Sequence, residues 1–146
     1  MTTRVEWPSL KRPLVAILRG IRPEETAGVI DALSDAGFEA IEIPLNSPEP
    51  FRSIEIAAQR APADCLIGAG TVLTVEEVGR LAGAGGRLMV SPNVDAAVIR
   101  AATGKGMVTM PGVFTATEAL LAASAGASAL KFFPASVLGP SGINAI

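Results

Sequence analysis

Residues 40–44 (AIEIP) and 129–133 (ALKFF) are short apolar stretches that each carry one charged residue, and they decide the fold. In a strand, successive side chains point to opposite faces. The apolar neighbours of Glu42 and of Lys131 are therefore predicted to face helices, while both charged side chains point to the other face. Central strands of an open sheet, covered by helices on both faces, read almost wholly apolar. A barrel interior can hold charged residues that are paired or functional, so the pattern favours a parallel barrel over a doubly wound sheet.

Strands and helices alternate along the rest of the chain. Strands are predicted from short apolar runs, at residues 14–18, 40–44, 65–68, 88–90, 107–110 and 129–133. Helices are predicted between them, at residues 23–36, 48–60, 75–82, 94–103 and 116–125, and residues 141–146 read as the start of another helix. Alternation of this kind predicts βαβ units and a parallel sheet.

Three similar triplets, at residues 35–37, 83–85 and 124–126, end in glycine shortly before a predicted strand. Glycine at that point can take the left-handed conformation that ends a helix. The repeat indicates one continuous α/β array, predicted as a single domain over residues 1–146 with residues 1–12 as a lead-in segment. A (βα)8 TIM barrel typically needs roughly 250 residues. We therefore expect a parallel (βα)8 TIM barrel of which this chain holds about the first six strands, so that it is incomplete at its C-terminus.

The composition excludes several classes of function. A net charge of −2 gives no electrostatic footprint for nucleic acid, and no apolar stretch approaches the ~20 residues that cross a bilayer. Cys65, the only cysteine, cannot form an internal disulfide and suits a reducing cytoplasm. Without histidine, a conventional zinc site and a Ser-His-Asp triad are implausible. We expect a cytoplasmic protein without a metal, in which carboxylates, lysines and hydroxyls carry any acid–base chemistry.

Lys131 is the strongest candidate for a nucleophile, because its neighbours in the strand are apolar. Burial disfavours the charged ammonium and lowers the pKa of a lysine, and a neutral amine attacks carbonyl carbon. The alternative is a structural lysine at a strand end, whose ammonium reaches solvent or pairs with a carboxylate. Glu42 could be that structural partner, or it could move protons at carbon, which needs a carboxyl group with a raised pKa. The two roles of Glu42 are compatible.

Other candidates lie where predicted strands end, which in a parallel barrel is the face that carries the active site. Arg19 has a guanidinium that suits a substrate carboxylate, and a solvated loop arginine is the alternative. Thr71 follows a Gly-x-Gly sequence and offers a hydroxyl where the backbone allows close approach. Asn46 and Pro92 are further candidate substrate contacts, although ordinary turn chemistry explains each of them without a ligand.

Four strings stand in order along the chain: ILRG at residues 17–20, AIEIPLNSP at 40–48, IGAGTV at 67–72 and LKFFP at 130–134. Together they resemble the family of 2-keto-3-deoxy-6-phosphogluconate/galactonate aldolases, over the chain from about Leu14 to its end. The resemblance implies a (βα)8 barrel that is commonly trimeric and needs neither a metal nor an organic cofactor. It also implies cleavage of a phosphorylated keto acid, a 2-keto-3-deoxy-6-phospho sugar acid, into pyruvate and glyceraldehyde 3-phosphate.

By this resemblance, Lys131 looks like the Schiff-base lysine and Glu42 like the general acid/base. Arg19 and Thr71 look like contacts near the pyruvate carboxylate end of the substrate. Asn46 stands where the gluconate branch usually has the arginine of a Thr-Leu-Arg string, so the chain looks like the galactonate branch. The family's phosphate-binding loops follow the seventh and eighth strands, and those residues are expected after Ile146. The expected partners are this small-molecule substrate and, at full length, two further copies in a homotrimer.

Two alternative interpretations of the function remain open. One is another small barrel lyase or isomerase that acts on a phosphorylated substrate without a Schiff base, and covalent trapping of Lys131 distinguishes it. The other is a non-catalytic doubly wound binding or signalling domain. A receiver-type domain would need clustered acidic residues at the end of its first strand, and this chain has Arg19 and Gly20 there.

Overall fold

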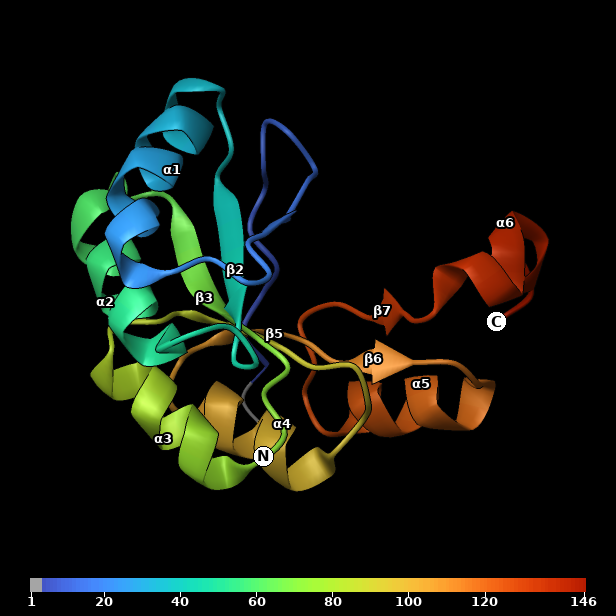
Figure 1. The fold of residues 1–146 in the computed structure, drawn as a ribbon. Coiled ribbons are helices and arrows are strands. Elements are labelled where there is room, and N and C mark those ends of the chain that lie inside the picture. Colours follow the sequence, from blue (N-terminus) through green and yellow to red (C-terminus); the bar gives the residue numbers. More distant parts are fainter. Residues whose placement is uncertain (1–3) are drawn as a thin grey trace.

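A computed structural model describes residues 4–146, and helices alternate with strands throughout (Figure 1). The strands are β1 (Ala16–Ile17), β2 (Ala40–Pro44), β3 (Leu66–Gly70), β4 (Leu88–Val90), β5 (Val108–Met110), β6 (Gly112–Val113) and β7 (Lys131–Phe132). The helices are α1 (Pro23–Asp35), α2 (Pro50–Arg60), α3 (Val75–Gly83), α4 (Ala96–Gly104), α5 (Ala116–Ser124) and α6 (Ala135–Ala145). The predicted alternation is confirmed, and residues 1–3 of the predicted lead-in segment lie outside the described residues.

All strand pairs are parallel. Strands β1 to β5 form one sheet in chain order, and β6 pairs with β7. A doubly wound sheet reverses its strand order at a switch point, and these five strands show no reversal. The order therefore argues against the doubly wound alternative and agrees with a parallel α/β array that winds in one direction.

Strands β5 and β6 act as one strand that Pro111 divides. The backbone N–H groups of Ala129, Lys131 and Phe133 donate to the carbonyls of Thr109, Pro111 and Val113, at 3.0, 2.9 and 3.0 Å. This regular spacing shows that the pairing runs past the proline without a shift in register. Because Pro111 has no N–H group to donate, the ladder loses one bond there, and the strand is split in two. The seven strands thus correspond to the six that the sequence predicts.

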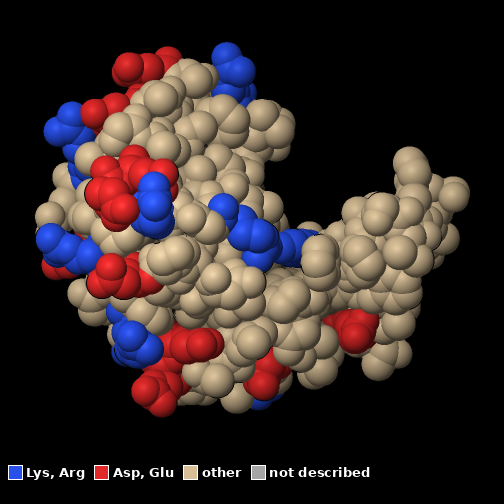
Figure 2. Space-filling view, viewed as in Figure 1, with Lys and Arg blue, Asp and Glu red and all other residues tan. Residues whose placement is uncertain are grey.

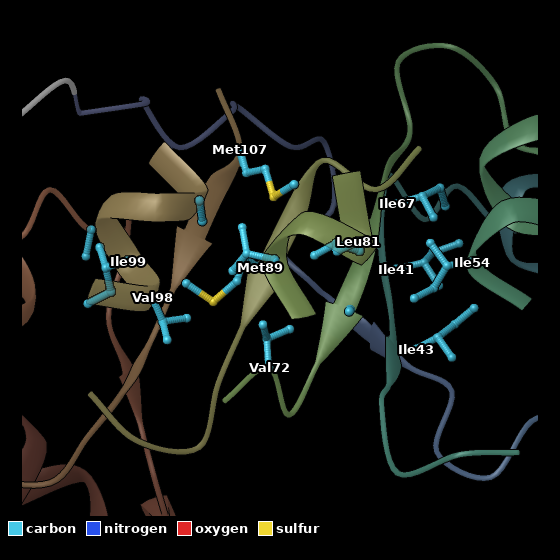
Figure 3. Packing of buried hydrophobic residues seen from close by; sticks show 14 of the residues in the cluster. Ile41, Ile43, Ile54, Ile67, Val72, Leu81, Met89, Val98, Ile99 and Met107 are labelled. Atoms are coloured by element: carbon cyan, nitrogen blue, oxygen red, sulfur yellow. The ribbon is translucent and has the colours of Figure 1, made fainter. Parts of the chain in front are cut away.

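The two faces of the sheet carry separate apolar clusters. Ile41, Ile43 and Met89 pack with helix residues such as Ile54 and Leu81, as Figure 3 shows. The opposite face carries a second cluster, formed by Ala40, Leu66, Leu88, Val90 and Val108, against which Val5, Trp7 and Leu10 of the N-terminal segment pack. The prediction that the isoleucines beside Glu42 face helices is confirmed. Burial of this kind stabilises the fold by about 1.5–3 kcal/mol for each large apolar side chain.

Local signals set the helix ends. The Thr74 side chain accepts from the N–H of Glu77 at 3.2 Å, and the Glu77 carboxylate accepts in return from the N–H of Thr74 at 3.1 Å. Such a capping box satisfies two donors that a helix start leaves free. Gly37, Gly85 and Gly126 have φ values of 82°, 83° and 96°, so the predicted left-handed glycines are confirmed.

The C-terminal part departs from the prediction. Helix α6 begins at Ala135 and not at residue 141, and it is interrupted at Gly139, whose φ of 65° and ψ of 171° are not helical. None of its residues is buried. Figure 1 shows α6 reaching away from the other helices, and Figure 2 shows this C-terminal lobe without charged atoms on the visible face. Within residues 4–146, no helix has both the length and the apolar character to cross a membrane.

Candidate functional site

The predicted site residues gather at the carboxyl edge of the sheet, because all strands run in one direction. Arg19 follows β1, Asn46 follows β2, Thr71 follows β3 and Pro92 follows β4, while Lys131 lies in β7. At the carboxyl ends of parallel strands, loops from different units come together and ligand sites form. The fold therefore brings this set to one edge.

Glu42 is the most deeply buried charged residue at this edge, with 2% of its surface exposed. Its Oε2 atom is buried, and no hydrogen-bond partner for it is found among the described residues. Desolvation raises the pKa of this carboxyl group, while the positive charges of Lys131 and Arg19 act in the opposite direction. A carboxyl group with a raised pKa keeps its proton to a higher pH than an ordinary carboxyl group does, which favours a role as a general acid.

Lys131 is half-buried, which corrects the prediction of a buried ammonium. Strand β7 has only two residues, and its lysine lies near the surface, with Nζ 4.9 Å from the centre of the Phe133 ring. Its charge influences the Glu42 carboxyl group, yet none of the ion pairs within 4.0 Å in the described part of the chain joins the two. The two groups are near enough to interact and are not locked together.

Arg19 and Asn46 are joined directly. The Arg19 Nη1 atom donates to Oδ1 of Asn46 at 3.0 Å, and both side chains are exposed. One residue further along each loop, the N–H of Gly20 donates to Oγ of Ser47 at 2.9 Å. Ser47 is 7% exposed, so this hydrogen bond is the more buried of the two that connect the loops. The geometry gives Asn46 a contact with Arg19, whereas the sequence alone suggested only a contact with substrate.

Thr71 has a φ of 57°, which is unusual for a β-branched residue. A conformation of this kind costs on the order of 1–3 kcal/mol, and such residues cluster at functional sites. The observation is consistent with the candidate role of Thr71. Pro92 is half-buried, and a Cβ atom on Gly112 would lie 2.2 Å from its carbonyl oxygen. This close backbone packing fits the turn interpretation of Pro92.

The neighbourhood contains functional features that the sequence did not reveal. Gly70 lies against the Glu42 carboxyl group, and Ser47 fastens the loop that carries Asn46. The signals were present as a Gly-x-Gly sequence and a serine after a predicted strand, but each also fits an ordinary turn. Figure 2 shows Lys and Arg atoms at the base of the hollow beside the C-terminal lobe. Within residues 4–146, no group of three His, Cys, Asp or Glu side chains is placed to hold a metal ion.

Both the sequence and the fold match known proteins. The KDPG and KHG aldolase family matches residues 8–146. A relative from Rhizobium meliloti (strain 1021), named probable 2-dehydro-3-deoxy-6-phosphogalactonate aldolase, is 73% identical over 143 residues, which are 98% of this chain and 68% of the relative. A solved structure described as native KDPGal has a TM-score of 0.92 at 51% identity, covering 96% of this chain and 68% of that one. A KDPG aldolase structure from Legionella pneumophila, with pyruvate captured at low pH as a covalent carbinolamine intermediate, has a TM-score of 0.82 at 26% identity, covering 91% and 64%.

Proposed function

Because the chain belongs to the KDPG and KHG aldolase family, we propose that it acts as a class I, Schiff-base aldolase. The proposed substrate is 2-dehydro-3-deoxy-6-phosphogalactonate or its gluconate epimer, and the products are pyruvate and D-glyceraldehyde 3-phosphate. One observation carries the proposal. A half-buried lysine and a buried carboxyl group with a raised pKa share one edge of the sheet, and the charge of the lysine acts to lower the pKa of the carboxyl group.

In the proposed reaction, the neutral amine of Lys131 attacks the C2 keto carbon and forms a carbinolamine. Loss of water, assisted by a proton from Glu42, leaves an iminium. That cation accepts the electron pair of the C3–C4 bond as the bond breaks, and the C4 hydroxyl gives its proton to the Glu42 carboxylate as the aldehyde leaves. Glu42 then protonates C3 of the remaining enamine, and hydrolysis of the new iminium frees pyruvate and the lysine. The iminium is the electron sink, so the proposed steps need neither a metal nor an organic cofactor.

The remaining site residues are assigned to substrate binding in this proposal. The Arg19 guanidinium suits the carboxylate of the keto acid, and its bond to Asn46 restricts its orientation. Thr71 offers a hydroxyl directly after the strand that lies beside Glu42. Pro92 remains a candidate contact on the next loop. The strained backbone at Thr71 supports a role in the site, because strain of this kind is retained where geometry matters for function.

We also propose that the array is a (βα)8 TIM barrel in which β1 to β7 form the first six barrel strands. Support comes from the strand order, from the continuity of β5 and β6, and from the separate apolar clusters on the two faces. A single domain over residues 1–146, cytoplasmic location and trimeric assembly stay predictions.

Trapping of pyruvate with borohydride tests the proposal. The chain has only three lysines, Lys11, Lys105 and Lys131, so peptide mass spectrometry can locate a reduced pyruvyl group unambiguously. The adduct is expected on Lys131 and is expected to vanish in Lys131→Ala. Lys105→Ala is the matched control and should trap as much pyruvate as the unsubstituted chain. An adduct on Lys11 or Lys105 alone, or on the N-terminal amine alone, contradicts the assignment.

A further inference from the structure

The face of β3 beside Glu42 has no side chains at its carboxyl end. The register pairs Glu42 with Gly68, and because side chains alternate along a strand, Gly68 and Gly70 lie on the same face as Glu42. Leu66 on this face belongs to the second apolar cluster, whereas Gly68 and Gly70 have no side chains. The strand therefore changes from a packed surface to bare backbone towards its carboxyl end. Leu88 lies over Gly68, whereas the Glu42 side chain lies over Gly70.

The contact at Gly70 is close and involves the whole carboxyl group. A Cβ atom added to Gly70 would lie 1.9 Å from Oε2, 2.5 Å from Cδ and 2.6 Å from Oε1 of Glu42. The carboxyl group therefore occupies the space that a side chain at position 70 would need. Gly70 is absent from the residues with positive φ, so its backbone conformation is open to any amino acid. The need for glycine at this position comes from Glu42.

We infer that Gly70 is a positioning residue for Glu42, and that the bare backbone at this position is the seat that fixes the carboxyl group. The inference rests on the proposed function, in which Glu42 moves protons at carbon. Packing is the natural means of holding this group, because no hydrogen-bond partner of Oε2 is found among the described residues. Gly70 brings no side-chain hydrogen-bond donor to this oxygen, and the carboxyl group is buried, in agreement with its raised pKa.

Gly70→Ala tests the inference through proton transfer. The added methyl group pushes the carboxyl group out of its seat, and a misplacement of about 1 Å can cost roughly 10²-fold in rate. Exchange of the pyruvate methyl protons should fall by about that factor, while borohydride still traps pyruvate on Lys131. The pH at which exchange is half-maximal should also move, because the displaced carboxyl group has a new environment. Gly79→Ala is the matched control, since a Cβ atom there meets nothing within 4 Å. Unchanged exchange and an unchanged pH profile in Gly70→Ala overturn the inference.

A double-mutant cycle on stability separates this inference from the proposed function. Gly70→Ala should lower the urea midpoint of the unsubstituted chain and lower it far less in a Glu42→Ala background, where the carboxyl group is gone. Equal losses in both backgrounds would show that Gly70 does not serve Glu42. The cycle needs no catalysis. If the unsubstituted chain fails to trap pyruvate, the proposed function fails, and the cycle still decides whether Gly70 holds Glu42.

Discussion

Replacing Glu42 by glutamine should remove one component of the dependence of stability on pH. Burial raises the pKa of Glu42 in the folded chain above its ordinary value of 4.5, so the folded state holds this proton more tightly than the unfolded state does. Its contribution to stability is therefore complete below about pH 4.5 and is lost as the pH rises through the folded pKa. Each unit of upward shift costs about 1.4 kcal/mol once the group is ionised. Lys131 and Arg19 reduce this cost, because their charges favour the carboxylate.

Urea unfolding from about pH 4 to about pH 8 measures the effect. The free energy of unfolding of the unsubstituted chain should include a decline with pH that Glu42→Gln lacks, because the amide does not titrate. The amide itself leaves a buried N–H unsatisfied, at a cost of about 1–3 kcal/mol. That cost is the same at every pH, so slopes are compared and not absolute values. Glu76→Gln, at an exposed position on α3, is the matched control and should keep the original slope. Identical slopes in Glu42→Gln and the unsubstituted chain would refute desolvation of Glu42.

The same Glu42→Gln chain tests proton transfer. Exchange of the pyruvate methyl protons should slow by roughly 10²-fold or more, the usual contribution of a positioned acid/base group. Trapping of pyruvate on Lys131 should be affected less, because imine formation has other sources of protons. Unchanged exchange in a folded variant would leave Glu42 with a structural role only.

Two further predictions concern the substrate. Asn46→Ala removes the bond at 3.0 Å that orients Arg19, and a bond of this kind contributes about 0.5–1.5 kcal/mol. The pyruvate concentration that gives half-maximal trapping should rise by roughly 2- to 10-fold, with the adduct still on Lys131, and an unchanged concentration would remove Asn46 from the binding of the carboxylate. Cleavage of the phosphogalactonate substrate should be at least as efficient as that of its gluconate epimer, compared by kcat/KM. A clear preference for the gluconate epimer would contradict the assignment of Asn46 to the galactonate branch.

Features governed by neighbouring residues could be predicted from the sequence. Side chains alternate in any strand, so the opposite directions of Ile41 and Glu42 followed from position alone and are confirmed by the two apolar clusters. The left-handed glycines after α1, α3 and α5 followed from the need to end each helix before a strand. The same reasoning applies to the capping box at Thr74, whose partner Glu77 is three residues away.

Features governed by distant residues could not be predicted. The exposure of Lys131 depends on which residues pack around β7. The apolar neighbours of Lys131 in its own strand do not show how much of the side chain those residues cover. The role of Gly70 depends on the side chain of Glu42 in the adjacent strand, 28 residues earlier in the chain. The start of α6 at Ala135 was missed because Gly139 and Pro140 suggest a break, and the helical turns lie on both sides of it. For Lys131 and Gly70 the deciding contact is tertiary, whereas the start of α6 was missed for a local reason.

The gap between Lys131 and Glu42 suits the proposed chemistry better than a direct ion pair would. In a close pair, each charge stabilises the other, so the pKa of the carboxyl group falls and that of the amine rises. Both changes oppose the reaction, because the amine must be neutral to attack carbonyl carbon and the carboxyl group must carry a proton that it can give to carbon. With the two groups apart, desolvation by burial outweighs the attraction of Lys131 and Arg19, and the pKa of Glu42 stays raised. A substitution that brought the Glu42 carboxyl group and the Lys131 amine into contact would therefore stabilise both charges. It would slow proton transfer at carbon.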